Sequence, residues 1–191
     1  SIKCRIGLGK DLNYEYFEEF VEEIIKSGIN IVYVHARNAF LNGISPKANR
    51  NVPPLDYTFV SRIKKKFPNI MFILNGGINN IEKAFELTNQ LDGVMLGRLI
   101  QTNPFILKNV DNIFYGEDKK QFVTEELIIK YFDDIKPALG KDSIFRLLSP
   151  LLQIFFGIPN SKDTKILIHK NIKSEKLDFI KQILLDFVKS N

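Results

Sequence analysis

The sequence predicts an α/β fold in its first part and a helical second part. Up to residue 98, short apolar runs alternate with amphipathic segments of helical period, which is typical of a parallel sheet covered by helices. After residue 98, apolar side chains recur at helical spacing and no strand pattern returns. A complete (β/α)8 barrel needs about 250 residues. The fold class predicted here is therefore the C-terminal half of such a barrel, followed by a small all-α domain.

Four strands are predicted in the first part, and each ends at polar or glycine residues. The predicted strands are residues 2–6, 29–34, 70–74 and 93–96. The polar groups at their ends are Lys3 and Arg5, His35, Asn75-Gly76-Gly77, and Gly97-Arg98. Because parallel strands of a barrel present their carboxyl ends on one face, these groups are expected to converge.

Three helices connect the strands, over residues 14–26, 57–66 and 81–91. Asn13 precedes the first as a candidate cap, and Ser27-Gly28 closes it. Between His35 and the second helix lies a polar loop of roughly 20 residues, far longer than most connections, and such loops are often functional.

The second part consists of helices in the prediction. They cover residues 102–110, 124–136, 142–156 with a break at Pro150, 160–169 and 174–188, with a linker over 111–120. Thr124 is expected to cap the second of them. We expect two domains, residues 1–115 and residues 116–191.

Composition excludes several classes of protein. No apolar run approaches the roughly 18–20 residues that span a bilayer, so no membrane segment is expected. Cys4 is the one cysteine of the sequence, so the chain cannot form an internal disulfide. With only two histidines besides, it offers few ligands for a metal site. Cys4 is interpreted as a buried apolar residue.

The net charge is +5, and residues 119–191 carry most of it, with 13 Lys and Arg against 9 Asp and Glu. This excess hints at a polyanionic partner.

The strand ends favour a phosphate-bearing redox cofactor. Two glycine-bearing ends one βα unit apart, with Arg98 beside the second, predict a phosphate site. Lys3 could stabilise negative charge on a reduced ring, and His35 could hydrogen-bond to it. The alternatives stay open at this stage: an ordinary Asn-Gly-Gly turn, a solvated Lys3 and a structural role for His35.

Several motifs in order resemble the C-terminal half of tRNA-dihydrouridine synthases, and the loop resembles the A-type subfamily. They are Lys3-Cys4-Arg5-Ile6-Gly7, His35-Ala36-Arg37, Ser45-Pro46-Lys47-Ala48-Asn49-Arg50 with Pro53-Pro54-Leu55-Asp56-Tyr57, Asn75-Gly76-Gly77-Ile78 and Gly97-Arg98. The second part matches more weakly, mainly through Phe156-Gly157-Ile158-Pro159.

The resemblance implies a TIM barrel that binds FMN, which NADPH reduces, and that converts uridine to 5,6-dihydrouridine in the tRNA D-loop, at positions 20 and 20a. Lys3 and His35 match the flavin-contacting residues of the family. The residues that match its FMN phosphate grip are Asn75, Gly76, Gly77, Gly97 and Arg98. The family's acid cysteine belongs to the N-terminal half, and Cys4 does not match it. We therefore expect no catalytic residue in this chain and little or no activity from it alone.

The resemblance also implies contacts with tRNA. Lys47 and Arg50 match basic loop positions, while Lys162 and Lys165 stand where A-type enzymes carry two arginines. The spacing of Lys162, Lys165 and His169 places them on one helix face, although a charged face is often merely solvated. The expected partners are tRNA and the N-terminal half of the barrel, with no metal and no membrane. Because residue 1 opens inside a strand, the chain is expected to be an incomplete part of a cytoplasmic enzyme.

Two other functions fit the residues less well. Another flavin TIM-barrel oxidoreductase could act on a small molecule, but the basic loop and helices argue against it. A truncated RNA-binding module would keep the basic surfaces without redox activity, and its RNA affinity would weaken steeply with salt.

Overall fold

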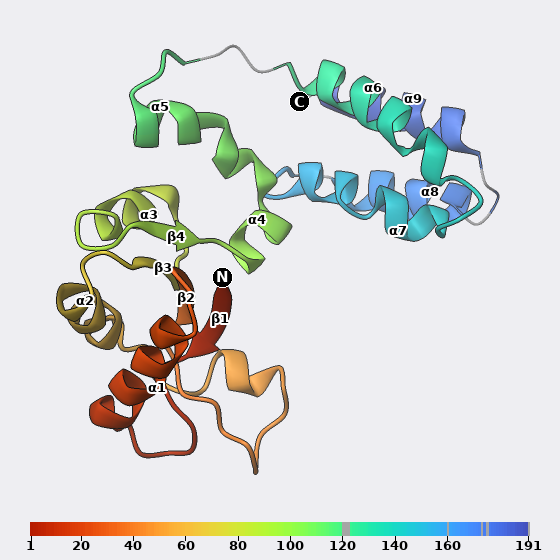
Figure 1. The fold of residues 1–191 in the computed structure, drawn as a ribbon. Coiled ribbons are helices and arrows are strands. Elements are labelled where there is room, and N and C mark those ends of the chain that lie inside the picture. Colours follow the sequence, from red (N-terminus) through yellow and green to blue (C-terminus); the bar gives the residue numbers. More distant parts are fainter. Residues whose placement is uncertain (120–122, 160, 173, 175, 191) are drawn as a thin grey trace. The chain divides into compact units, whose positions relative to one another are not determined.

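The computed structural model describes residues 1–119, 123–159, 161–172, 174 and 176–190. The chain divides into two compact units, Ser1–Leu99 and Ile100–Asn191, and each is described by itself (Figure 1). No helix among these residues is long and apolar enough to cross a membrane.

The first unit is built on a four-stranded parallel sheet, which confirms the predicted α/β class. Its strands are β1 (Ile2–Arg5), β2 (Ile31–His35), β3 (Met71–Asn75) and β4 (Gly93–Met95). Their order in the sheet is the same as their order in the chain. The register aligns Arg5 with His35, His35 with Asn75, and Asn75 with Met95. The predicted strand ends therefore lie side by side.

Helices α1 (Tyr14–Lys26) and α2 (Tyr57–Lys66) supply apolar side chains to the core on one face of this sheet. Val32, Val34, Phe72 and Leu74 alternate along β2 and β3 and are completely buried there. The helices begin where the sequence predicts, because the side chains of Asn13 and Asp56 accept hydrogen bonds from the first-turn N–H groups.

Helix α3 (Ile81–Leu87) is shorter than the predicted segment 81–91. The hydroxyl of Thr88 donates to the carbonyl of Phe85 at 2.6 Å, which is a local alternative to continuing the helix. The following turn leads into Asp92, whose carboxylate accepts from Phe72 N at 2.8 Å and pairs with Lys64. Asp92 thus ties the start of β4 to β3.

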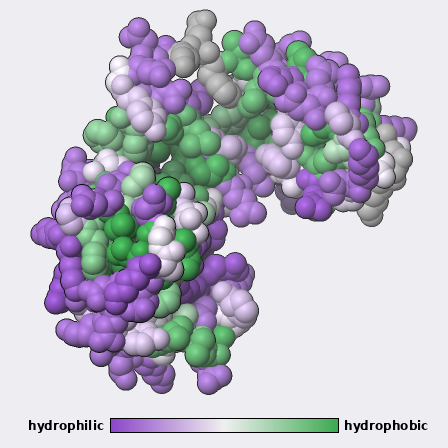
Figure 2. Space-filling view, in the orientation of Figure 1, coloured by the Kyte–Doolittle hydropathy of each residue, from purple (hydrophilic) through white to green (hydrophobic). Residues whose placement is uncertain are grey.

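The described residues of the second unit form helices around a separate apolar core. The elements after β4 are α4 (Arg98–Thr102), η2 (Pro104–Asn109), α5 (Val110–Tyr115), α6 (Thr124–Ile135), η3 (Lys136–Ala138), α7 (Ile144–Leu148), η4 (Leu151–Phe155), α8 (Ser161–Ile172) and α9 (Leu177–Lys189). Pro150 separates α7 from η4, as predicted. In the space-filling view, hydrophilic side chains cover much of the visible surface of each unit (Figure 2).

Several predicted boundaries in this part differ from the structure. The predicted linker 111–120 begins with α5, because Asp111 lies in a first helical turn and Gly116 ends the helix in the left-handed conformation (φ 68°). Lys120 lies outside the described residues, as do Asn160 and the residues at 173 and 175 near two predicted helix starts. Thr124 is the first residue of α6 and makes no capping bond, since Val123 occupies the cap position.

The division between the units, after Leu99, also precedes the expected boundary at residue 115. Phe105 packs against the apolar core of the second unit. The segment between α4 and Gly116 is therefore held by helical packing, which depends on contacts with residues far along the chain.

Candidate functional site

The carboxyl edge of the sheet gathers the polar side chains that the sequence predicts. Arg5, His35 and Asn75 are neighbours in the strand register, so their side chains share one face. Lys3 lies on that face too, two residues before Arg5. The helix-covered core is on the opposite face, so these polar groups point away from it. Cys4 faces that core, half-buried, and burial raises the pKa of its thiol to about 11. It is therefore protonated at neutral pH.

His35 is the half-buried centre of this edge. Burial is the main reason that its pKa is lowered to about 4, and the charges of Arg5 and Lys3 lower the pKa further, whereas the neighbouring Asn75 side chain acts in the opposite direction. The imidazole is therefore neutral at pH 7. Its Nε2 atom is buried and has no hydrogen-bond partner among the described residues. Because buried polar atoms are nearly always paired, this atom is suited to a ligand.

The turn after β3 packs directly against this histidine. Gly76 and Gly77 both have positive φ angles, of 110° and 68°. A Cβ atom on Gly76 would lie 3.0 Å from His35 Nε2, and one on Gly77 would overlap the side chain of Leu55. The Tyr57 hydroxyl donates to Gly76 O at 2.8 Å. Glycine is thus required here by both conformation and space, and the backbone of the turn is held close to the imidazole.

The second predicted glycine site is less constrained. Nothing lies within 4 Å of the position that a Cβ atom on Gly97 would occupy. Arg98 opens α4, and its Nη1 donates to the Asn51 side chain at 2.6 Å. The arginine predicted to hold phosphate therefore also holds the long loop between β2 and α2.

Three further arginines lie around the same loop. Arg5 Nη1 donates to the carbonyls of Asn38 and Asn49, at 2.7 and 2.9 Å, and Arg37 Nη1 donates to the carbonyl of Pro53. Burial, followed by the charges of Arg37 and Arg50, lowers the pKa of Arg5. Carbonyl partners do not neutralise these cations, so the strand ends carry a positive potential suited to an anion.

The predicted RNA-binding residues are distributed over both units. Lys47 and Arg50 lie at the short helix η1 (Ala48–Arg50) of the loop, and both are exposed. Lys162 is exposed on α8. Lys165 differs, because it is half-buried and its Nζ lies over the ring of Phe155 at 5.5 Å. Because Phe155 is buried in the helical core, the Lys165 ammonium lies close to that core and is less available than that of Lys162.

Sequence reasoning placed Arg5 at the strand ends without giving it a role, and it did not assign Arg37 or Tyr57 to the site. The signal for the arginines was available: each lies two residues from a predicted site residue, Lys3 or His35, in an extended segment or just after one. No such signal exists for Tyr57, because its contact with Gly76 joins residues 19 positions apart.

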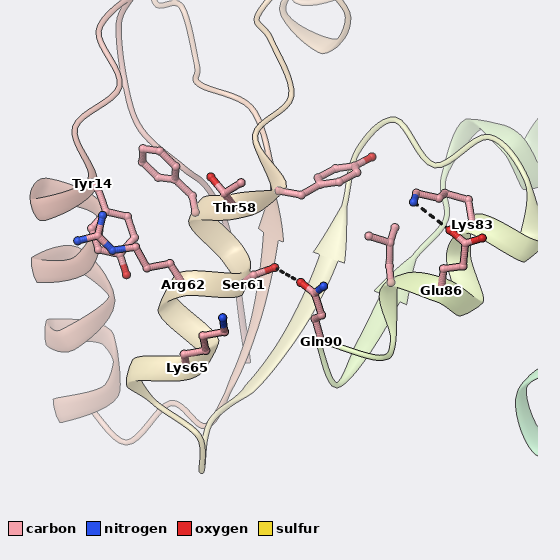
Figure 3. A pocket seen from close by; sticks show the side chains of 11 residues that line it. Tyr14, Thr58, Ser61, Arg62, Lys65, Lys83, Glu86 and Gln90 are labelled. Carbon is pink, nitrogen blue, oxygen red and sulfur yellow. Dashed lines mark hydrogen bonds and ion pairs between the residues drawn. The ribbon is translucent and has the colours of Figure 1, made fainter.

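Another hollow, of about 700 Å³, lies along α2 and α3, and its lining includes Tyr57 (Figure 3). Ser61 and Gln90 hydrogen-bond across it at 3.0 Å. Its basic residues include Lys83, which pairs with Glu86, and Arg62, which lies 3.6 Å from the centre of the Tyr14 ring. The hollow holds none of the predicted site residues. Among the described residues, no group of three or more His, Cys, Asp or Glu side chains could hold a metal ion.

The titration of His35 leads to a stability prediction. An unfolded histidine has a pKa near 6.5, so between about pH 6.5 and 4 the unfolded chain binds the extra proton. The stability that the neutral His35 contributes is fully present above pH 6.5 and is lost as the pH falls toward 4. We expect a loss of about 1–2 kcal/mol for this half-buried ring, measured by urea unfolding from pH 7 to pH 4.

A variant of His35 separates this effect from the titration of carboxylates. His35→Gln should flatten the pH dependence relative to the wild-type protein. Equal slopes for the wild-type protein and His35→Gln would mean that His35 is not held neutral by the fold.

The fold and site define a class: a parallel α/β protein that gathers cations, a neutral histidine and a glycine turn at its strand ends, which suits a phosphate-bearing ligand. The sequence model of the dihydrouridine synthase (Dus) family matches residues 1–183. The chain belongs to this family.

Three curated relatives are named tRNA-dihydrouridine(20/20a) synthase. The relative from Shewanella oneidensis is 32% identical over 174 residues, which cover 90% of this chain and 51% of the relative. The relative from Xanthomonas axonopodis pv. citri is 35% identical over 163 residues, covering 85% and 48%. The relative from Yersinia pestis is 35% identical over 173 residues, covering 90% and 50%. The chain spans about half the length of the curated relatives it matches.

Proposed function

We propose that this chain is the C-terminal half of a tRNA-dihydrouridine synthase, which uses FMN and NADPH to reduce uridine in the tRNA D-loop at positions 20 and 20a. The first unit would be half of a TIM barrel, and the helical residues would bind tRNA. The observation that carries the proposal is the buried, unpartnered Nε2 atom of the neutral His35 beside the Gly76-Gly77 turn. The names of the relatives support the tRNA substrate, and a tRNA substrate fits a cytoplasmic compartment.

The residues at the strand ends fit FMN chemically. The backbone of the turn at Asn75-Gly76-Gly77, with Gly97 and Arg98, would hold the phosphate, because glycines admit close approach and arginine offers a forked cationic donor. When bound and reduced by NADPH, FMN would supply the hydride that goes to the uracil ring.

The chain's own residues would orient and stabilise the ring. Lys3, exposed on the same sheet face, would place a positive charge where a reduced ring carries negative charge. His35 would hydrogen-bond to the ring through Nε2. Its lowered pKa keeps the imidazole neutral, so it adds no positive charge to a site that already contains Arg5 and Arg37. The proton for the uracil would come from an acid cysteine in the N-terminal half of the barrel.

The test begins with the visible absorption spectrum and the intact mass of the purified protein. Flavin bands with a mass well above that of this chain would mean that the N-terminal half is present. NADPH-dependent reduction of those bands, and a gain of two hydrogens in uridines 20 and 20a of unmodified tRNA, would then support the proposal. A colourless protein that still binds tRNA would instead favour an RNA-binding module. Flavin without affinity for tRNA would favour an oxidoreductase of small molecules.

The two lysines of α8 are expected to contribute unequally to tRNA binding. Each phosphate contact changes the slope of log K against log salt by roughly 0.7–0.9. Lys162→Gln should reduce the slope by about that amount. Lys165→Gln should reduce it less, because its ammonium lies over the Phe155 ring. The measurement is a salt titration of tRNA affinity.

Lys130 provides the matched control for this titration. Its ammonium is paired with Asp134 at 2.8 Å on α6, so Lys130→Gln should change the slope least. Equal slopes for all three variants and the wild-type protein would contradict a tRNA contact at Lys162.

A further inference from the structure

Two exposed aromatic rings lie against each other in the second unit. Phe145 of α7 and His169 of α8 have ring centroids 5.8 Å apart and planes inclined by 30°. Phe145 is 52% exposed, and His169 is exposed as well. In contrast, Phe155 and Phe187 of the same unit pack edge to face at 4.6 Å, within or against the core. The Phe145–His169 pair thus leaves flat aromatic surface in solvent.

A hollow of about 700 Å³ lies beside the Phe145 ring. Its lining includes Lys141, the hydroxyl-bearing Ser143 and the apolar Ile172. Among the described residues of its lining, the carboxylate is that of Asp142, which is paired with Arg146 at 2.9 Å. The hollow therefore offers apolar surface, a hydroxyl and a cation beside the exposed ring.

His169 also shares a helix face with a predicted phosphate contact. Lys162 lies seven residues earlier on α8, about two turns away, and is exposed. One flank of α8 therefore combines a lysine with an aromatic ring. Proteins that grip single-stranded nucleic acid combine the same two elements, basic groups for the phosphates and aromatic rings for the bases.

We propose that Phe145 and His169 form a stacking platform for one unpaired base of the RNA, a role that rests on the RNA recognition proposed above. The base lies on the outer face of the Phe145 ring, over the hollow. It does not enter between the two rings, because a sandwich with bases stacked about 3.4 Å apart needs a separation of nearly 7 Å. Lys141 and Lys162 are placed to meet the flanking phosphates.

The test compares two RNAs with the purified protein: an unmodified tRNA transcript and a fully paired RNA duplex of similar length. Phe145→Leu keeps apolar volume but removes the π face. We expect it to weaken binding to tRNA by roughly tenfold while leaving binding to the duplex and the salt slope unchanged. Phe145→Tyr keeps the ring and should restore the affinity for tRNA.

Phe179 of α9 is the matched control, because it is 51% exposed and is not part of the platform. Phe179→Leu should bind both RNAs like the wild-type protein. Thermal unfolding of each variant checks that the helical unit stays folded, and the tyrosine variant tests the platform if the leucine variant does not fold.

The outcomes separate this inference from the function on which it rests. If the wild-type protein binds tRNA and Phe145→Leu binds it equally well, the platform is overturned while the proposed function stands. If Phe145→Leu and Phe179→Leu lose the same affinity, the effect is general and the platform is overturned too. If the wild-type protein binds no tRNA, the RNA recognition itself fails and the platform with it.

Discussion

Replacing Gly77 with alanine is expected to lower the free energy of unfolding of the first unit by about 2–4 kcal/mol. Two costs add at this position. A non-glycine residue at φ 68° is strained by about 1 kcal/mol. The new Cβ atom would also overlap the Leu55 side chain, and forcing atoms into a packed region typically costs about 1–3 kcal/mol. Urea unfolding monitored by circular dichroism measures the change.

Two other glycines separate these costs. Gly116 has the same φ of 68° with nothing near its Cβ position, so Gly116→Ala should show the conformational cost alone. Gly97 has neither a positive φ nor a close neighbour, so Gly97→Ala should leave stability unchanged. The double variant Leu55→Ala/Gly77→Ala should lose less free energy of unfolding than the sum of the losses of the two single variants. If the two losses simply add, Leu55 does not enclose the turn.

Replacing Arg98 with leucine is expected to weaken FMN binding about 100-fold under the proposed function. Hydrogen bonds to a charged group contribute about 1.5–3 kcal/mol, and a guanidinium can make two to one phosphate. Arg98 is exposed at the start of α4, next to a glycine that leaves open space at the backbone. Equilibrium titration of flavin fluorescence against protein concentration measures the affinity.

Arg98 also donates to Asn51, so a control must separate its two contacts. Asn51→Ala removes the side-chain contact with the loop, but it keeps the cation and the hydrogen bond from Arg98 Nη2 to the Arg50 carbonyl at 3.4 Å. We expect the affinity for FMN to change less than threefold in this variant, while the loop becomes more sensitive to protease. An Asn51→Ala variant that loses FMN as severely as Arg98→Leu would show that the arginine acts by positioning the loop rather than by binding phosphate.

Much of the first unit was predictable because its signals are local. Apolar alternation along the strands and the helix cap at Asn13 depend on residues close in sequence. These signals located β1 through β4 to within two residues. Helix α3 was predicted too long, because the apolar pattern continues through Leu91. In the structure, the Thr88 hydroxyl donates to the Phe85 carbonyl and a turn follows.

The second part was less predictable, since its boundaries depend on contacts at long range. Phe105 packs against the helical core, so the residues expected to complete the first domain belong to the second unit. For Lys165, the spacing predicted an exposed position beside Lys162. The structure shows it half-buried over Phe155, because its face of α8 borders the core.

The sequence by itself determined which polar groups meet at the strand ends. Strand order follows chain order in this parallel sheet, so local patterns that end at Lys3 and Arg5, His35 and Asn75 are enough to align them. Only the tertiary structure decided the state of those groups. The buried Nε2 of His35 and its lowered pKa, the enclosure of Gly77 by Leu55, and the clamping of the long loop by Arg5 arise from residues distant in sequence. No local pattern records such contacts, because they exist only once the chain has folded.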